Sequence, residues 1–177
     1  FDNAKSARNL GAEIEVRTGL DLIGLNNFSL VANAALIDSK VHFEEGDIED
    51  DRAMQGQSPY LVNAAIFYQK KEWGLSVSLQ YNIVGKRIVV LGEANQDPSQ
   101  YIPDTYEMPR NTLDFSISKS IWKYFKIRGG IKDNFNEKVI FKQFPIVEVN
   151  GEKVNREQIT RSFSPGQIFS LGVSMKF

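Results

Sequence analysis

The sequence alternates apolar and polar side chains with a period of two, and this feature constrains the fold more than any other. The clearest example is the C-terminal stretch 168–177. One face of this stretch carries five apolar residues in succession: Phe169, Leu171, Val173, Met175 and Phe177. The opposite face carries small or charged residues such as Ser170, Ser174 and Lys176. Since successive side chains of a β-strand point to opposite faces, the pattern predicts a strand with one apolar side.

The same alternation recurs upstream, and no segment has the periodicity of an amphipathic helix. The further predicted strands cover residues 10–18, 28–36, 60–68, 75–83, 112–118 and 125–132. Short connections (21–27, 70–73, 119–124) alternate with long ones (40–58, 86–110, 135–165). We therefore expect an all-β, antiparallel fold of about seven strands, with all short turns at one end and all long loops at the other.

Composition excludes several classes of function. The 21 Lys and Arg residues balance 22 Asp and Glu residues, so the basic patch of a nucleic-acid-binding protein is not expected. With no Cys and a single His, disulfides, thiol chemistry and Cys/His zinc sites are excluded. No apolar run approaches the roughly 18 to 20 residues of a membrane helix. A transmembrane β-barrel remains compatible, because its apolar face is hidden in alternation.

Two all-β architectures fit these observations: a segment of a transmembrane β-barrel and a soluble β-sandwich. Short turns at one end and long loops at the other are typical of the barrel. Aromatic residues gather at the short-turn end, as they do at a bilayer interface: Trp73, Trp122, Tyr124, Phe125 and Phe177. The polar face carries groups that suit a wet lumen: Glu13, Glu15, Arg17, Gln80 and Lys132. The barrel segment is the favoured interpretation.

Three phrases of the sequence resemble one family. The run Asp51-Arg52-Ala53-Met54-Gln55-Gly56-Gln57-Ser58-Pro59-Tyr60 resembles a phrase of TonB-dependent outer-membrane receptors of the Bacteroidetes type. The stretch 7–17 resembles the N-x-G-x-E-x-E strand of that family, and 130–137 is similar to its K-N-L-F-N phrase, with Asp133-Asn134 in place of the commoner pair. A terminal Phe177 on an alternating strand resembles the signal that the barrel-assembly machinery reads.

This resemblance implies a plugged barrel of about 22 strands in the bacterial outer membrane. Residues 1–177 would be the C-terminal portion of that barrel, and the opening Phe1-Asp2-Asn3 suggests a piece of a longer chain. The implied partners are the plug and the earlier strands of the same receptor, the TonB system acting through the plug, and the lipid bilayer. The resemblance also allows a surface lipoprotein partner.

An acidic stretch is the first candidate site. Glu44, Glu45, Asp47, Glu49, Asp50 and Asp51 place six carboxylates within eight residues. Oxygen ligands of this kind suit Ca²⁺, but the spacing matches no EF-hand. A solvated loop is the favoured interpretation, and no metal site is predicted. His42, at the start of this loop, is expected to be inert surface. Glu13 and Glu15 are expected to belong to a lumen wall in which Arg17 is their charge partner.

An aromatic stretch of the second long loop is the best candidate for ligand contact. Tyr101, Asp104, Tyr106 and Arg110 combine rings with groups that form hydrogen bonds, which suits a sugar or a chelate. Self-packing of the loop is the alternative. Gln55 and Gln57 are expected to order the start of the third strand.

The sequence therefore predicts a receptor that imports a scarce ligand (a siderophore, cobalamin, glycan or peptide) and catalyses no reaction, with no cofactor. The alternative is a structural or adhesion barrel whose loops bind a partner without transport. An upstream plug and a segment that engages TonB would distinguish the importer from this alternative.

Overall fold

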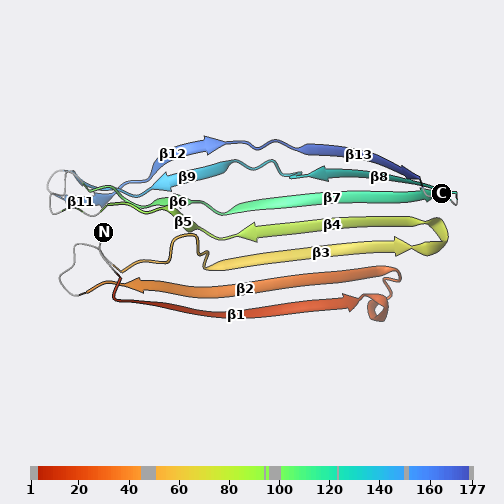
Figure 1. The fold of residues 1–177 in the computed structure, drawn as a ribbon, viewed down its shortest axis with the longest axis horizontal. Helices are drawn as coiled ribbons and strands as arrows, with labels where there is room; N and C mark the ends of the chain where they lie inside the picture. Colours follow the sequence, from red (N-terminus) through yellow and green to blue (C-terminus); the bar gives the residue numbers. More distant parts are fainter. Residues whose placement is uncertain are drawn as a thin grey trace.

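The computed structural model describes residues 4–44, 51–93, 95, 101–122, 124–149 and 152–175. The fold is all-β and antiparallel, as predicted. Seven strands form one sheet in their sequence order: β1 (Ser6–Gly19), β2 (Phe28–His42), β3 (Tyr60–Lys70), β4 (Leu75–Val84), β7 (Arg110–Ile121), β8 (Phe125–Lys132) and β13 (Ile168–Met175). They lie side by side (Figure 1), and β1 and β13 are the open edges. These seven strands match the seven predicted from alternation.

The strand register brings the predicted apolar positions to one face of this sheet. Residues directly opposite each other in an antiparallel pair project to the same face. Leu79, for example, pairs with Ile66 of β3 and with Phe115 of β7. On the other face, Ser78 pairs with Ser116, and Ser116 pairs with Gly130. We call these the apolar face and the polar face.

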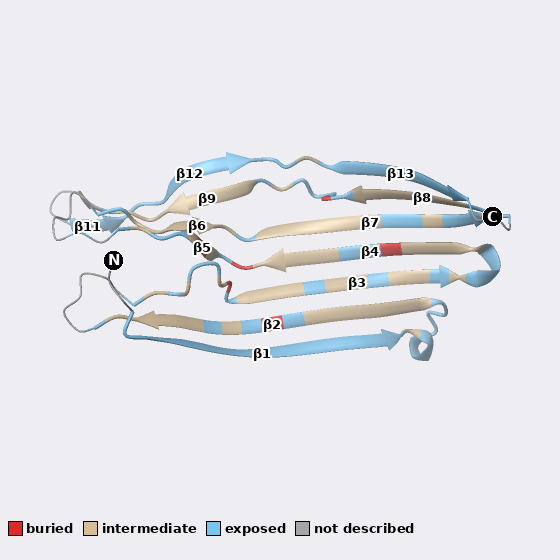
Figure 2. Ribbon diagram, viewed as in Figure 1, coloured by how far each residue is buried: buried red, intermediate tan, exposed pale blue. Residues whose placement is uncertain are grey.

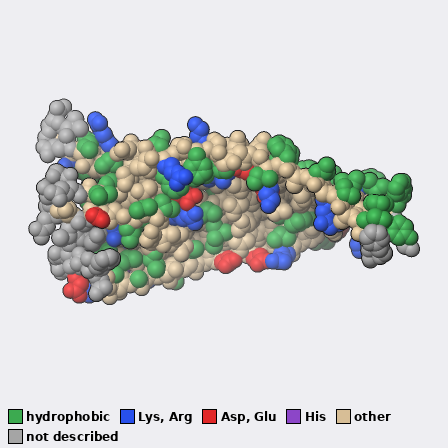
Figure 3. Space-filling view, turned by 45° about the horizontal axis from the view of Figure 1, so that its top comes forward, with side chains coloured by type: hydrophobic (Ala, Val, Ile, Leu, Met, Phe, Trp, Pro, Cys, Tyr) green, Lys and Arg blue, Asp and Glu red, His purple; other side chains and the backbone are tan. Residues whose placement is uncertain are grey.

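Tight turns join the strands at one end of the sheet. Single turns of 3-10 helix, η1 (Asp21–Ile23) and η2 (Lys71–Trp73), follow β1 and β3. Each ends at a glycine with positive φ, Gly24 (80°) and Gly74 (56°). Gly74 is also close to β7, since an added Cβ would lie 2.8 Å from the Cβ of Ser120. Hydrophobic side chains, with Lys or Arg beside them, gather at this short-turn end (right in Figure 3).

The sequence predicts loops for the long connections, whereas the structure has six further strands within them. β5 (Arg87–Val90), β6 (Thr105–Glu107), β9 (Val139–Gln143) and β12 (Gln158–Phe163) form a four-stranded sheet in the order β12-β9-β6-β5, and β10 (Ile146–Val149) pairs with β11 (Glu152–Asn155). In Figure 1 the four-stranded sheet lies beyond the ends of β4, β7, β8 and β13. It was missed because its strands are short and two of its pairings are interrupted, at Ile88/Val90 and at Ile159/Arg161.

The described residues bury very little apolar surface. Ala35 and Ile88 are the buried hydrophobic residues among them, whereas Leu171 is 81% exposed and Ile14 69% exposed. Figure 2 shows that β1 and β13 are exposed along their whole length. The seven-stranded sheet thus has no second layer over its apolar face within the described residues. None of the described helices is long and apolar enough to span a membrane.

Candidate functional site

The aromatic stretch that the sequence singles out lies at the long-loop end, where Tyr101 and Asp104 are near enough to Tyr106 to affect its pKa, whereas Arg110 has different surroundings. Asp104 Oδ1 accepts hydrogen bonds from the backbone N–H of Gly92 (2.7 Å) and from Arg52 (3.4 Å). The Asp104 side chain is only 13% exposed. Tyr101 is 45% exposed. Asp104 therefore holds the connection between β5 and β6 to the segment before β3, and Tyr101 is the more accessible of the two.

Tyr106 belongs to a cluster of rings and ammonium groups on the four-stranded sheet. Its ring lies edge-on to Phe144, with 5.7 Å between centroids. Lys86 Nζ lies 4.6 Å from the Tyr106 ring centroid and 5.3 Å from that of Phe144. Burial raises the pKa of Tyr106, and the charges of Asp104 and Tyr101 act in the same direction. This phenol is therefore neutral at physiological pH and able to donate a hydrogen bond.

Arg110 makes different contacts, at the junction between the two sheets. Its guanidinium forms an ion pair with Asp133 and donates a hydrogen bond to the backbone oxygen of Glu137 (3.0 Å). The Glu137 carboxylate accepts a hydrogen bond from the backbone N–H of Asn111 (2.8 Å), and the Asp133 N–H donates to Asp114 (2.9 Å). We call Arg110, Asn111, Asp114, Asp133 and Glu137 the junction clamp. Arg110 thus has a structural role, whether or not it also meets a ligand.

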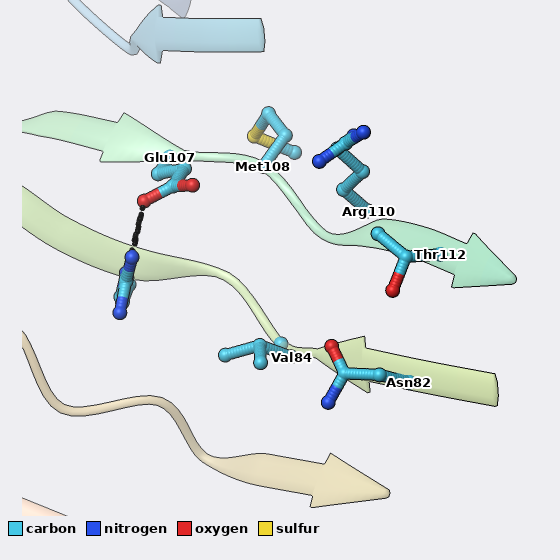
Figure 4. A pocket seen from close by; sticks show the side chains of 8 residues that line it. Asn82, Val84, Glu107, Met108, Arg110 and Thr112 are labelled. Atoms are coloured by element: carbon cyan, nitrogen blue, oxygen red, sulfur yellow. Dashed lines mark hydrogen bonds and ion pairs between the residues drawn. The ribbon is translucent and has the colours of Figure 1, made fainter. Parts of the chain in front are cut away.

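A cavity of about 120 Å³ lies beside the clamp. Figure 4 shows the side chains that line it, among them Asn82, Glu107, Met108, Arg110 and Thr112. Arg87 also lines it and donates two hydrogen bonds to Glu107 Oε2, at 2.7 and 2.9 Å. This volume suits a few water molecules or one polar group of a larger ligand, since drug-sized ligands occupy about 300 Å³ or more.

A larger hollow of about 640 Å³ lies on the polar face. It crosses β4, β7, β8 and β13 where small side chains stand in register: Ser116, Gly130 and Ser170. Two cations, Arg128 and Lys132, also line it. This hollow is large enough for a small-molecule ligand. Gln80 and Lys132, which the alternation assigns to the polar face, line it, whereas Arg128 and the serine–glycine row were not predicted.

The remaining predicted residues of the polar face have local partners. Arg17 forms an ion pair with Glu15, whereas Glu13 accepts a hydrogen bond from Asn33. The expectation that Arg17 is the charge partner is thus confirmed for Glu15, and Glu13 has a different partner.

The Gln-Gly-Gln-Ser-Pro-Tyr phrase packs against β2, β3 and β5. Gln55 donates a hydrogen bond to the backbone oxygen of Val89 (2.8 Å), and the N–H of Gly56, where φ is +81°, donates to the backbone oxygen of Ile88 (2.7 Å). Ser58 is buried and donates to the backbone oxygen of Tyr60 (2.7 Å). Gln57 donates to the backbone oxygen of Ser58 (3.2 Å). Gln57 therefore bonds directly before β3, as expected, whereas Gln55 links the phrase to β5.

The acidic stretch falls largely outside the described residues. Glu44 and Asp51 are described. The other four acidic residues lie outside the described residues, as does the terminal Phe177: Glu45, Asp47, Glu49 and Asp50. His42 Nδ1 lies 2.7 Å from Asp51 Oδ2, and Lys40 Nζ lies 3.2 Å from the same oxygen. In the part of the chain that is described, no group of three His, Cys, Asp or Glu residues is arranged to hold a metal ion. His42 is therefore bonded to a carboxylate rather than isolated.

Sequence reasoning missed the junction clamp and the partners of Tyr106. The signal for the clamp was the Asp133-Asn134-Phe135-Asn136-Glu137 phrase, in which Asp133 and Asn136 have positive φ (55° and 49°). Lys86 and Phe144 carried no recognisable signal, because they lie 58 residues apart and meet only through strand pairing.

No family model, curated protein or solved structure matches the chain in a comparison with known proteins.

Proposed function

We propose that this chain is the C-terminal portion of an outer-membrane β-barrel that imports a scarce ligand with energy supplied by TonB. The observation that carries the membrane part of the proposal is the uncovered apolar face of the seven-stranded sheet. Leu171 and Ile14, 81% and 69% exposed, lie on this face, and no described residue forms a layer over them. A sheet with one apolar face needs either a second layer or lipid to cover that face.

A long run of the apolar face without charged side chains supports lipid as its cover. On β4 this face runs without a charge over nine residues, from Leu75 to Ile83. At a rise of about 3.3 Å per residue and a strand tilt of about 40°, this length spans roughly 20 to 25 Å, close to the apolar band of an outer-membrane barrel. At the long-loop end the band is bounded by the ion pair between Arg8 and Asp38 (2.7 Å).

The two open edges support a larger barrel. The backbone groups of β1 and β13 have no pairing strand on their outer sides within the described residues. An open edge is unstable in lipid, since its N–H and C=O groups find no water. We therefore expect earlier strands of the same protein to pair with both edges and to close the barrel.

The transport part of the proposal rests on the resemblance and on the polar face. The 640 Å³ hollow, with Arg128 and Lys132, would line the lumen through which the ligand passes. The ring cluster around Tyr106 would face the cell exterior beside the loops. Tyr101, Asp104 and Tyr106 remain the proposed ligand contacts, with Tyr101 the most accessible.

Epitope insertion into the complete protein tests the membrane part. A tag inserted between Arg156 and Glu157, which separate β11 from β12, should bind antibody on intact cells. A tag inserted into the Leu20–Asn27 turn should bind antibody only after the outer membrane is opened. Equal accessibility of both tags on intact cells would contradict the barrel.

Disruption of TonB tests the transport part. Cells that depend on this protein for a limiting nutrient should lose growth when TonB is disrupted, as they do when the protein itself is deleted. An outer-membrane location without any TonB-dependent phenotype would favour the structural or adhesion barrel.

A further inference from the structure

Two lysines interrupt the apolar face at the short-turn end of the sheet. Leu75 of β4 pairs with Lys70 of β3 on one side and with Lys119 of β7 on the other. All three side chains therefore project to the apolar face at one level. With neighbouring strands about 4.8 Å apart, the two lysine backbones are separated by roughly 10 Å. Among the described strands of the seven-stranded sheet, these are the charged residues on the apolar face at this end.

Both ammonium groups contact the same residue, Trp73. Lys70 Nζ lies 4.4 Å from the centroid of the Trp73 ring, and Lys119 Nζ donates a hydrogen bond to the backbone oxygen of Trp73 (2.5 Å). The turn is fixed against β7, because the N–H of Ser120 donates to the backbone oxygen of Gly74 (2.8 Å). The Trp73 side chain remains 54% exposed. A ring and two positive charges are thus held together at the edge of the apolar band.

No ion pair with a described carboxylate neutralises these two lysines. The acidic residues of these turns, Asp21 and Glu72, line a hollow with Phe28, Gln69 and Lys71 whose lining includes neither the two lysines nor Trp73. Two cations beside an apolar band fit a ligand whose anionic group adjoins an apolar body. A phospholipid has this form, because its phosphate lies at the end of its acyl chains.

We propose that Lys70, Lys119 and Trp73 form a binding site for an anionic phospholipid in the bilayer leaflet at the short-turn end. The two ammonium groups hold the lipid phosphate, the Trp73 ring lies at the headgroup boundary, and Leu75 and Val77 contact an acyl chain. The site rests on the proposed membrane location, since a soluble sheet would not meet a lipid at this place. It does not depend on the imported ligand.

Fluorescence quenching by brominated lipids tests the site in the complete protein. The emission of Trp73 is isolated as the difference between the wild-type protein and the Trp73→Phe variant. The protein is inserted into phosphatidylcholine vesicles that contain either brominated phosphatidylglycerol or the same mole fraction of brominated phosphatidylcholine. Attraction by each lysine should enrich the anionic lipid near Trp73 by about fivefold. The brominated anionic lipid should therefore quench Trp73 much more strongly than the brominated zwitterionic lipid.

Matched variants distinguish lipid binding at this site from general attraction of anionic lipid to the lysines of the protein. Lys70→Gln with Lys119→Gln should abolish the extra quenching by phosphatidylglycerol, whereas Lys70→Arg with Lys119→Arg should preserve it. Lys71→Gln with Lys126→Gln removes two cations outside the apolar face and should leave the extra quenching unchanged. Equal quenching by the two brominated lipids in the wild-type protein would overturn the lipid site, even if the Gln variant failed to insert.

Two further outcomes bear on the membrane location and on the chemical group that the lysines bind. If no brominated lipid quenches Trp73, the membrane location itself fails, and the lipid site fails with it. If inorganic phosphate, but not chloride of equal ionic strength, removes the extra quenching, the two ammonium groups recognise the phosphate of the lipid headgroup, which supports the site.

Discussion

The seven-stranded and four-stranded sheets use the same antiparallel pairing but sort their side chains differently. In the larger sheet one register row is apolar all the way from β2 to β13: Leu30, Ile66, Leu79, Phe115, Ile131 and Phe169. In the smaller sheet one row joins Ile88, Tyr106 and Lys142, which are a buried aliphatic, a phenol and an ammonium group. The larger sheet thus keeps apolar and polar side chains largely on separate faces, whereas the smaller sheet mixes them within one row.

This difference indicates the condition under which a strand alternates strictly between apolar and polar residues. A face that meets one uniform environment selects side chains of one kind along its whole length. In the region of the four-stranded sheet, specific contacts replace the alternation of apolar and polar residues. The cluster of Lys86, Tyr106 and Phe144 is an example. The junction clamp marks the level at which this change occurs, since Arg110 begins β7 and Asp133 directly follows β8.

The largest effect is expected from breaking the clamp that separates the two sheets. Arg110→Met leaves the Asp133 carboxylate, 12% exposed as a side chain, without its cation. Loss of one partner from a buried ion pair costs about 3 to 5 kcal/mol. Denaturant unfolding in micelles should show this loss, and hydrogen exchange should increase at the amides of β5 and β6.

Two controls sharpen this test. Arg8→Met breaks an ion pair whose side chains are 64% and 63% exposed, and it should cost at most about 1 kcal/mol. Adding Asp133→Asn to Arg110→Met removes the uncompensated charge and should recover part of the loss, because Asn tolerates the positive φ at this position. Equal costs for Arg110→Met and Arg8→Met would show that the clamp does not stabilise the junction.

A smaller but more diagnostic effect is expected from charges placed on the two faces of β13. Phe169 lies on the apolar face and Ser170 on the polar face of the same edge strand, and Phe169 shares its row with Leu79, the middle of the uncharged run of β4. If the apolar face meets lipid, Phe169→Arg should cost about 2 to 4 kcal/mol near the bilayer midplane. Ser170→Arg should cost much less. Folding into bilayers measures both, and equal costs would contradict the proposed membrane location.

The turn that carries Trp73 should respond to loss of its glycine. Gly74→Ala places a side chain at φ 56° and only 2.8 Å from Ser120 Cβ, which should cost about 1 to 2 kcal/mol or more. Gly172→Ala is the matched control, because an added Cβ there has no neighbour within 4 Å and φ is not in the left-handed region. A Gly74→Ala protein as stable as Gly172→Ala would show that the turn is not fixed against β7.

The smallest effect concerns pH at the long-loop end. Hydrogen bonds from His42, then Lys40, and then the Phe43 N–H lower the pKa of Asp51 below its ordinary value of 3.8. The ionised carboxylate therefore stabilises the fold above that value, and the contribution is lost as the pH falls through the lower, folded-state pKa. Asp51→Asn should unfold with a weaker dependence on acid pH than the wild-type protein. An unchanged pH profile would contradict a stabilising role for this group.

Several predictions made from the sequence are confirmed by particular elements. Alternation placed all seven long strands, because each repeats its pattern over at least seven residues and keeps one register. The role of Gln57 directly before β3 was also predicted from its motif, whereas the hydrogen bond of Gln55 to β5 was not. Two candidate ligand residues have partners that the sequence did not indicate. Lys86 and Phe144, 20 and 38 residues from Tyr106, contact its ring, and Asp133, directly after β8, pairs with Arg110.

The sequence by itself determined the all-β class, the order of the long strands and the two faces of their sheet, because a period of two is a local property of the chain. Only the tertiary structure decided the four-stranded sheet, the junction clamp and the contact of Lys119 with Trp73. These depend on which residues strand pairing brings together, and no short stretch of sequence contains both partners. Arg110 and Asp133, 23 residues apart, meet because the pairing of β7 with β8 brings the start of β7 beside the end of β8.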